Sequence, residues 1–279
     1  MLTGAVMPEL PEVETIRRDL DAHIVGRRIA RADVLDASLV QAPAVDVFSR
    51  RLIGGRVRTV GRRGKYLRVQ VAENWMVMHL MMSGRIYLQP ASERVRHTRL
   101  VITFDRGPAL HFVDTRRFGR AWLLSVPELD DLMADMGMEP LEDGFDGPKL
   151  HELLRDRQRA IKPTLLDQTI VAGIGNIYAD ESLWLARIHP ATPAGSLSRR
   201  KLDDLAAAIG TALRTAIAHG GTSFRTFADA RGRPGRNQER LNVFRRTGEP
   251  CPRCGRIVKR IVIGQRSTHI CPGCQRIHR

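Results

Sequence analysis

Met7-Pro8-Glu9-Leu10-Pro11-Glu12-Val13-Glu14-Thr15 opens the first regular element of the chain, and the rest of the fold can be worked out from it. Pro11 suits the first turn of a helix, where a missing N–H costs nothing. Beyond it, apolar residues recur at spacings of three and four and end before a glycine: Val13, Ile16, Leu20 and Ile24, then Gly26. This pattern predicts a helix over residues 11–25 with an acidic segment at its start.

Pro8 is chemically unusual because it follows a methionine and stands beside acids. With a free N-terminus at Pro8, its secondary amine could attack C1′ of a sugar and form an iminium, as catalytic lysines do. While the preceding residues remain attached, the nitrogen is a tertiary amide without an available lone pair. We therefore expect translation to start at Met7 and residues 1–6 to be a non-native extension. Otherwise the chain is not that kind of enzyme.

The composition is typical of a soluble protein that meets a polyanion. The chain has 279 residues, 43% of them hydrophobic, which suggests two modest cores and hence two domains. No apolar run approaches the roughly 20 residues of a membrane helix, so we expect a soluble, cytoplasmic protein without a membrane partner. The 45 basic and 30 acidic residues give a net charge of +15. Nucleic-acid-binding, ribosomal and membrane-surface proteins share such a charge.

The distribution of the charge is more informative than its sum. Residues 225–279 hold 14 Lys and Arg against three acids, so this segment carries +11 of the +15. It also holds all four cysteines. We expect the C-terminal segment to be the main phosphate-binding surface.

The periodicity divides the chain into a β-rich and a helical part. Short apolar runs between residues 27 and 125 predict an antiparallel sandwich, with strands at 66–71, 99–104, 109–113 and 120–124. Helical spacing follows at 149–159, 163–168, 177–186 and 198–219. The predicted fold class is α+β, with domains 7–126 and 127–224, a flexible loop at 225–240 and a cysteine module at 241–279 after the extension 1–6.

The four cysteines form two Cys-x-x-Cys pairs separated by 16 residues: Cys251, Cys254, Cys271 and Cys274. This spacing matches a zinc ribbon in which four thiolates close around one Zn²⁺. A pair of disulfides is the alternative, disfavoured for an intracellular protein. A site closed by four protein ligands predicts a structural zinc that holds a basic hairpin rigid.

Three further motifs allow both a structural and a functional interpretation. Gly173-Ile-Gly175-Asn176 precedes a predicted helix and is either a connector or an anion site built on helix amides. Lys65 begins an apolar strand and is either a solvated strand end or a site residue. The turn Asp114-Thr-Arg116-Arg117-Phe118-Gly119 is either a hairpin or a wedge whose Phe enters a base stack.

Together these motifs resemble those of formamidopyrimidine-DNA glycosylases from Met7 to the last cysteine pair. The matching segments are 8–15, 64–67, 79–84, 116–119, 173–179, 220–222 and the ribbon with Gln265-Arg266. Leu10 favours this branch over the related endonuclease VIII branch, which usually has Gly there. The resemblance implies a β-sandwich with an N-terminal helix, a helix–two-turn–helix domain and a C-terminal zinc-ribbon β-hairpin. It also implies duplex DNA bound between domains by a protein that we expect to be a monomer.

The family resemblance implies excision of oxidised purines, 8-oxoguanine and formamidopyrimidines among them, followed by cleavage of the strand at the abasic sugar. It assigns the Schiff-base nucleophile to Pro8 and a general acid at the sugar to Glu9. It gives Lys65 a part in proton transfer and Arg266 the δ-elimination.

The DNA contacts implied by the resemblance come from both halves of the chain. Met82, Arg116 and Phe118 would fill the space of the everted nucleotide, and Asn176, Arg157 and His97 would contact phosphates or DNA nearby. Glu12 and Glu181 match acids that line the pocket.

Some positions depart from the family pattern. Gly235-Arg236-Asn237 stands where Gly-Tyr-Phe is common, Phe244-Arg245 replaces a usual Tyr-Gly, and Val95 replaces a histidine. Lesion preference is therefore open. A non-catalytic lesion-binding or DNA-binding protein is the alternative if the residues before Pro8 are retained. A plain zinc-ribbon scaffold would leave the acidic N-terminal motif unexplained.

Overall fold

The computed structural model describes residues 7–93, 95–224 and 227–277 and divides into two compact units. Unit 1 comprises Met1–Asp135 and His219–Arg236, and unit 2 comprises Met136–Ala218 and Asn237–Arg279. The expected extension at residues 1–6 and part of the expected loop 225–240 lie outside the described residues. Within the described part of the chain, no helix is long and apolar enough to cross a membrane.

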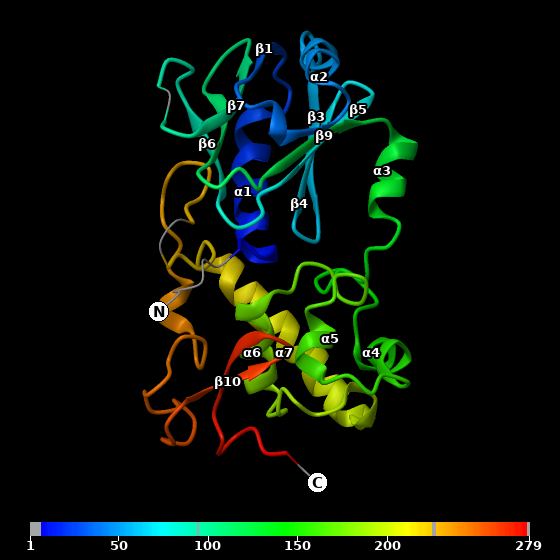
Figure 1. Ribbon diagram of the computed structural model, residues 1–279, viewed down its shortest axis with the longest axis vertical. Helices are drawn as coiled ribbons and strands as arrows, with labels where there is room; N and C mark the ends of the chain where they lie inside the picture. Colours follow the sequence, from blue (N-terminus) through cyan, green and yellow to red (C-terminus); the bar gives the residue numbers. More distant parts are fainter. Residues whose placement is uncertain (1–6, 94, 225–226, 278–279) are drawn as a thin grey trace. The chain divides into compact units, whose positions relative to one another are not determined.

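Unit 1 is a sandwich of two sheets, as the short apolar runs predicted. The four-stranded sheet has the order β1-β7-β8-β6, and the five-stranded sheet has the order β2-β9-β5-β4-β3 (Figure 1). All pairs are antiparallel except β2 with β9. The elements of this unit are α1 (Leu10–Ile24), β1 (Ile29–Val34), β2 (Val40–Ala42), α2 (Val45–Leu52), β3 (Val57–Arg63), β4 (Tyr66–Val71), β5 (Asn74–His79), β6 (Gly84–Gln89), β7 (Thr98–Phe104), β8 (Ala109–Asp114), β9 (Arg120–Leu124) and α3 (Val126–Met133).

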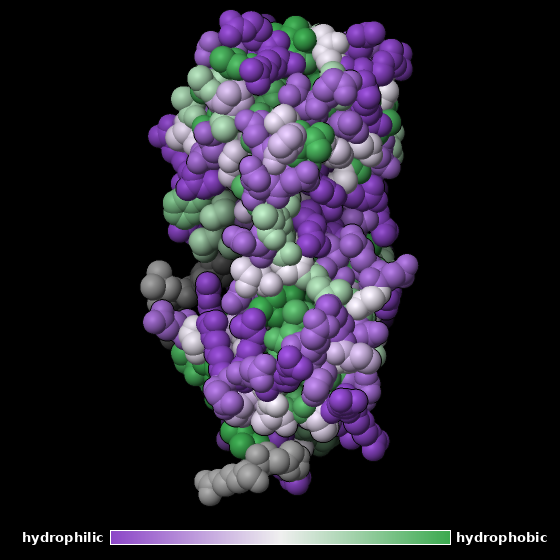
Figure 2. Space-filling view, turned by 90° about the vertical axis from the view of Figure 1, so that its right-hand side faces the viewer, coloured by the Kyte–Doolittle hydropathy of each residue, from purple (hydrophilic) through white to green (hydrophobic). Residues whose placement is uncertain are grey.

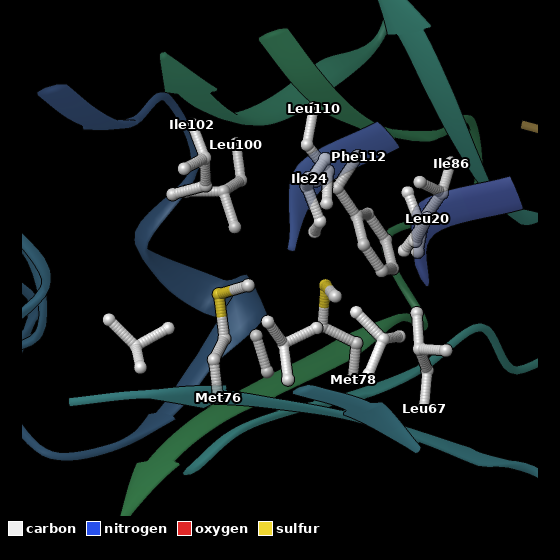
Figure 3. Close-up of a cluster of buried hydrophobic side chains, with 14 of the residues drawn as sticks. Leu20, Ile24, Leu67, Met76, Met78, Ile86, Leu100, Ile102, Leu110 and Phe112 are labelled. Carbon is white, nitrogen blue, oxygen red and sulfur yellow. The ribbon is translucent and has the colours of Figure 1, made fainter. Parts of the chain in front are cut away.

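The core of unit 1 lies between its sheets and is closed by α1. Leu100, Leu110 and Phe112 from one sheet face Met76 and Met78 from the other (Figure 3). The apolar stripe of α1 completes this core, because Val13, Ile16, Leu20 and Ile24 are all at most 1% exposed. A helix that buries one full face between sheets holds both of its ends in fixed positions.

Unit 2 is helical and ends in a two-stranded hairpin. Its elements are α4 (Gly147–Leu154), α5 (Ile161–Leu165), α6 (Asn176–Leu185), α7 (Arg199–Ala218), β10 (Lys259–Ile263) and β11 (Arg266–Ile270). The helix expected at 149–159 ends early, at Leu154. The reason is that residues 155–159, Arg-Asp-Arg-Gln-Arg, offer no apolar side chain to bury, and Ala160 instead bridges to Pro193.

The segment after α7 returns to unit 1 and packs on its sandwich. Leu88 N donates to Ala230 O at 2.7 Å, and Ala230 is fully buried in the core. Asp229 accepts bonds from the amides of Arg231 and Arg233 and so closes a turn. Residues 227–236, expected to be flexible, thus have specific contacts.

The mainly hydrophilic face in Figure 2 carries only small hydrophobic areas.

Candidate active site and nucleic-acid interface

The start of α1 is built around two buried acids. Glu9 and Glu12 are 2% and 1% exposed, and they form a capping box in which Glu12 Oε2 accepts the Glu9 amide at 2.9 Å. The other oxygen of Glu12 accepts the amide of Thr222 at 2.7 Å. Pro8 is buried immediately before this box. The Glu12 carboxylate therefore fixes the backbone next to Pro8 and ties it to a segment 210 residues away.

Gly221 is required for this contact. Its φ is +81°, and a Cβ there would lie 3.1 Å from Glu12 Oε1 and 2.9 Å from the ring of Phe227. Any side chain would be strained by the backbone conformation and by this close approach. The Gly-Gly-Thr motif at 220–222 thus serves to bring the Thr222 amide against the N-terminal acid.

Lys65 lies at the same end of the sandwich as the start of α1. Helix α1 runs antiparallel to β3, because the contacts between them pair the end of one with the start of the other. Just after the helix, Gly26 N donates to Val57 O. Nearer its start, Arg17 contacts Val60 O and Glu14 pairs with Arg62 at 3.5 Å. Continuing this order, the β3–β4 turn at Gly64-Lys65 falls beside the first turn of the helix. The structure thus brings the predicted Lys65 to the end of unit 1 that holds Pro8 and Glu9.

His79 pairs with Tyr66 across β4 and β5 at this same end. Burial lowers the pKa of His79 to about 4, with further lowering by the nearby Lys65 and Arg120 cations. The ring is neutral at pH 7, and its Nδ1 accepts the Met81 amide at 3.0 Å. His79, the last residue of β5, therefore fixes the turn that leads to Met82.

The three predicted wedge residues form one cluster, in which Arg116 and Phe118 are exposed and Met82 is half-buried. The Arg116 guanidinium lies 4.6 Å from the centre of the Phe118 ring, and its Nη1 lies 3.9 Å from Sδ of Met82. Phe118 is 42% exposed although it is a large apolar side chain. An aromatic ring held open to solvent under a guanidinium is a group available to insert between bases.

Asp114 holds the turn that presents this cluster, a role we did not anticipate from the sequence. Its carboxylate accepts the Ser83 hydroxyl, the Arg116 amide at 3.0 Å and the Gly119 amide at 2.7 Å. The Asp114 amide in turn donates to the His97 carbonyl at 3.0 Å. The backbone of His97 is therefore joined to the same turn.

A second, separate cluster lies in unit 2 where α6 meets the hairpin. Asn176 is the first residue of α6, and its Nδ2 donates to the carbonyl of Ser267 at 3.0 Å. Arg266 is the residue before Ser267 and is exposed at the start of β11. The structure thus places Asn176 and Arg266 next to each other. Arg157 is outside this cluster, because its described hydrogen bonds are with Leu153, Leu154 and Gly195.

A buried ion pair beneath this cluster was missed by sequence reasoning. Lys162 and Asp180 are fully buried and lie 2.7 Å apart. Lys162 Nζ also donates to Ser267 O at 2.8 Å and to Thr268 Oγ1 at 2.9 Å. Asp180 accepts the amide of His269 at 2.9 Å. Two helices of unit 2 thereby hold the strand that carries Arg266.

Glu181 is fully used as a scaffold acceptor. It is 4% exposed, and its two oxygens accept the amides of Asn242, Val243 and Phe244 and the side chain of Asn242, each at 2.9 Å. Burial raises the pKa of Glu181, against the lowering effect of these bonds. These contacts fix the entry into the cysteine module, and none of them shows the pocket role that we predicted.

The four cysteines meet in one place. Their Sγ atoms all lie within 4.8 Å of one another, with Cys254 and Cys271 at 3.3 Å and Cys251 and Cys274 at 3.9 Å. These separations exceed a disulfide bond of about 2.05 Å and suit four thiolates around one ion. The residues present therefore fit the predicted structural zinc. Arg253 anchors the module by donating to Trp184 O at 2.9 Å.

Comparisons with known proteins agree with this architecture. Three family models match along the chain: the formamidopyrimidine-DNA glycosylase N-terminal domain over residues 7–121, its H2TH domain over 136–228, and a zinc finger found in FPG and IleRS over 248–277. A formamidopyrimidine-DNA glycosylase of Moorella thermoacetica is 47% identical over 252 residues, covering 89% of this chain and 92% of the relative. One from Roseiflexus is 46% identical over 251 residues, covering 89% of this chain and 92% of its own length.

Solved structures are also similar over nearly the whole chain. Lactococcus lactis Fpg in complex with DNA containing an abasic site superimposes with a TM-score of 0.90 at 38% identity, covering 96% of this chain and 100% of that one. MutM in complex with DNA containing carbocyclic 8-oxo-G gives 0.90 at 37% identity, covering 97% and 100%. With three family models that together span most of the sequence, the chain belongs to the formamidopyrimidine-DNA glycosylase family.

Proposed function

We propose a division of labour among the residues of this chain for the activity of its family. The chain is a bifunctional DNA glycosylase and AP lyase that acts on oxidised purines such as 8-oxoguanine and formamidopyrimidines. Its partner is duplex DNA that contains an oxidised base or an abasic site, and we propose that it acts as a monomer in the bacterial cytoplasm. Relatives in complex with such DNA support this choice.

Pro8 is the proposed nucleophile. Its secondary amine, once free, forms a bond to C1′ while the bond from C1′ to the base breaks and the electron pair leaves with the base. Loss of the proton from the nitrogen and opening of the sugar ring leave an iminium. Glu9, buried beside Pro8, supplies a proton to the sugar ring oxygen in this step. The capping box keeps the two residues in register.

Lys65 assists the proton transfers that accompany base loss and β-elimination. The antiparallel course of α1 and β3 supports this role, because it brings the β3–β4 turn to the Pro8 end of the sandwich. Arg266 serves the later δ-elimination from the hairpin. The zinc, when bound, supplies no chemistry and only keeps that hairpin folded.

The wedge cluster offsets the cost of extruding the damaged nucleotide, which is a few kcal/mol. Phe118 enters the stack, Arg116 faces the orphaned base, and Met82 fills the remaining space. Asn176 at the start of α6 binds a phosphate beside the lesion, where helix amides favour an anion. Arg157 and His97 add outer contacts to the backbone.

The observation that carries the proposal is the convergence of Pro8, Glu9 and Lys65 at one end of unit 1. Its test is excision from a duplex with one 8-oxoguanine under single-turnover conditions. Lys65→Met should slow base release at least tenfold while binding of the uncleaved duplex changes little, and Arg63→Met is the control for a lost neighbouring charge. Equal excision rates for the Lys65 variant and the unsubstituted chain would contradict the role.

A further inference from the structure

Four arginines gather at the end of unit 1 that lies away from the proposed site. They come from three segments joined by backbone bonds: Gly26 N to Val57 O at 2.9 Å, Val57 N to Arg27 O at 2.8 Å, and Asp105 N to Arg28 O at 2.8 Å. We name this surface the distal arginine corner, and it consists of Arg27, Arg28, Arg56 and Arg106. The backbones of Arg28 and Arg56 form an isolated antiparallel β-bridge.

The distal arginine corner is separated from Pro8 by the full length of α1. Pro8 precedes the 15-residue helix and Arg27 follows it, so about 22 Å of helix lies between them. The β7–β8 turn at 105–107 belongs to the corner, whereas the wedge turn lies at the other end of β8. Duplex DNA has a persistence length of about 50 nm and cannot fold back over such a span. A phosphate bound at the corner therefore belongs to a different stretch of duplex from the stretch that is bound at Pro8.

The charge of the corner is left unbalanced, unlike that of three arginines in the neighbouring elements. Arg31 pairs with Asp33 at 2.6 Å, and Arg50 pairs with Asp46 at 3.5 Å. Arg58 also has an acid partner, Glu73.

Among the residues that the structure describes, none of the four corner arginines has an ion-pair partner. The acid within these segments is Asp105, whose carboxylate accepts the backbone amide of Arg28 at 3.2 Å.

Three of the corner guanidiniums are held in place by single backbone carbonyls. Arg27 donates to Arg106 O at 3.1 Å and Arg28 to Gly54 O at 3.1 Å, while Arg56 donates to Gly26 O at 2.8 Å. A Cβ at Gly107 would lie 2.1 Å from Arg27 Nη1, so the turn fits closely under this side chain. Each guanidinium has five N–H donors. One bond fixes the side chain and leaves most donors available, which lowers the entropy cost of binding an anion.

We propose that the distal arginine corner binds the phosphate backbone of a second DNA duplex while the catalytic end holds the first. Planar guanidinium forks match phosphate oxygens in pairs, which makes arginine better suited than lysine to this contact. The corner would let the enzyme bridge two DNA segments. This goes beyond the proposed function and assumes only that the catalytic end holds DNA.

A capping role alone accounts for less of the geometry. Cations are favourable near a helix C-terminus, and Arg27 and Arg56 lie just beyond the end of α1. One cation is enough for that effect, however, and Arg106 comes from a different sheet turn. The Arg106 side chain also makes no hydrogen bond to any described residue, so no such bond gives this side chain a structural role.

The test uses a duplex with an uncleavable abasic-site analogue, fixed to beads in excess so that every catalytic end stays occupied, and a labelled undamaged duplex in solution. The unsubstituted protein should capture the labelled duplex. R28Q/R56Q/R106Q should capture at least about tenfold less, and the slope of log affinity against log salt should fall by about three, since each phosphate contact contributes about 0.9. Arg27 is kept because it packs on Gly107. R106Q alone, which breaks no internal bond, should lower the slope by about one.

The matched control is R31Q/R50Q/R58Q, which removes the same three charges from neighbouring, acid-paired positions. It should capture the labelled duplex as well as the unsubstituted protein does. Excision from a short duplex should be unchanged in both triple variants, which separates this proposal from the proposed function. Equal loss of capture in the two triple variants would reduce the effect to net charge and overturn the proposal. Absence of capture by the unsubstituted protein would also overturn the proposal. Binding of polyglutamate without binding of the labelled duplex would overturn it too and point to an acidic protein partner.

Discussion

Lys162→Met should destabilise unit 2 by about 4 kcal/mol. The substitution removes a fully buried ammonium and leaves the Asp180 carboxylate without its ion-pair partner at 2.7 Å. Breaking one partner of a buried pair costs about 3–5 kcal/mol, because the remaining charge stays desolvated. The carbonyl of Ser267 and the hydroxyl of Thr268 also lose a donor. Methionine fills most of the volume, so loss of packing contributes little.

Urea unfolding monitored by tryptophan fluorescence measures this effect. Trp184 belongs to unit 2, whereas Trp75 and Trp122 belong to unit 1 and can be replaced by Phe in the reference protein. A double-mutant cycle with Asp180→Asn isolates the pair. The double variant should be more stable than the sum of the single losses predicts, by at least 1 kcal/mol.

The same substitution should affect the proposed chemistry of the hairpin. Ser267 O then has only Asn176 as a described donor, and Arg266 next to it is less firmly held. The ratio of δ- to β-elimination products should fall while base release persists. A loss under about 1 kcal/mol with additive single effects would refute the buried pair as the support of β11.

Three further outcomes follow from the structure. Phe118→Ala should slow excision of 8-oxoguanine at least tenfold and leave cleavage of a preformed abasic site nearly unchanged. The reason is that the ring, 42% exposed, is proposed to stabilise the extruded state of the damaged nucleotide. Equal losses on both substrates would contradict this role. The free energy of unfolding should drop by about 2 kcal/mol between pH 7 and pH 5. The reason is that the pKa of a histidine in the unfolded chain is about 6.5, whereas the pKa of His79 in the folded chain is about 4, so the unfolded chain gains a proton first. Urea titrations at the two pH values should show a smaller drop for His79→Asn. Zinc removal by a chelator should abolish DNA binding through the hairpin and lower the melting temperature, and a colorimetric assay should find one zinc per chain.

Local patterns were enough to predict most elements of the fold. The apolar stripe of α1 and the alternating residues of β4 identify the faces that these elements bury, because the sequence period and the burial coincide. The paired cysteines likewise predict one site where four thiols meet. The end of α4 was predicted wrongly, because the prediction extended the helix into residues 155–159, which have no apolar side chain to bury.

The supports of the site were harder to predict. Lys162 and Asp180 look like solvated charges in the sequence, and only the docking of β11 on α5 and α6 buries them. Glu12 and Thr222 are far apart in the chain, and no local signal joins them. Motifs identify the residues that are proposed to meet DNA, whereas several of the polar contacts that hold them join segments far apart in the chain.

The central claim is that Pro8 acts through a free amine. It is tested by borohydride trapping on a duplex with an abasic site, using one chain that begins at Pro8 and one that retains residues 1–7. The chain that begins at Pro8 should give a covalent complex whose peptide map places the sugar on Pro8, and the longer chain should give none. Equal trapping by both chains, an adduct on Lys65, or no complex from the chain that begins at Pro8 would contradict it.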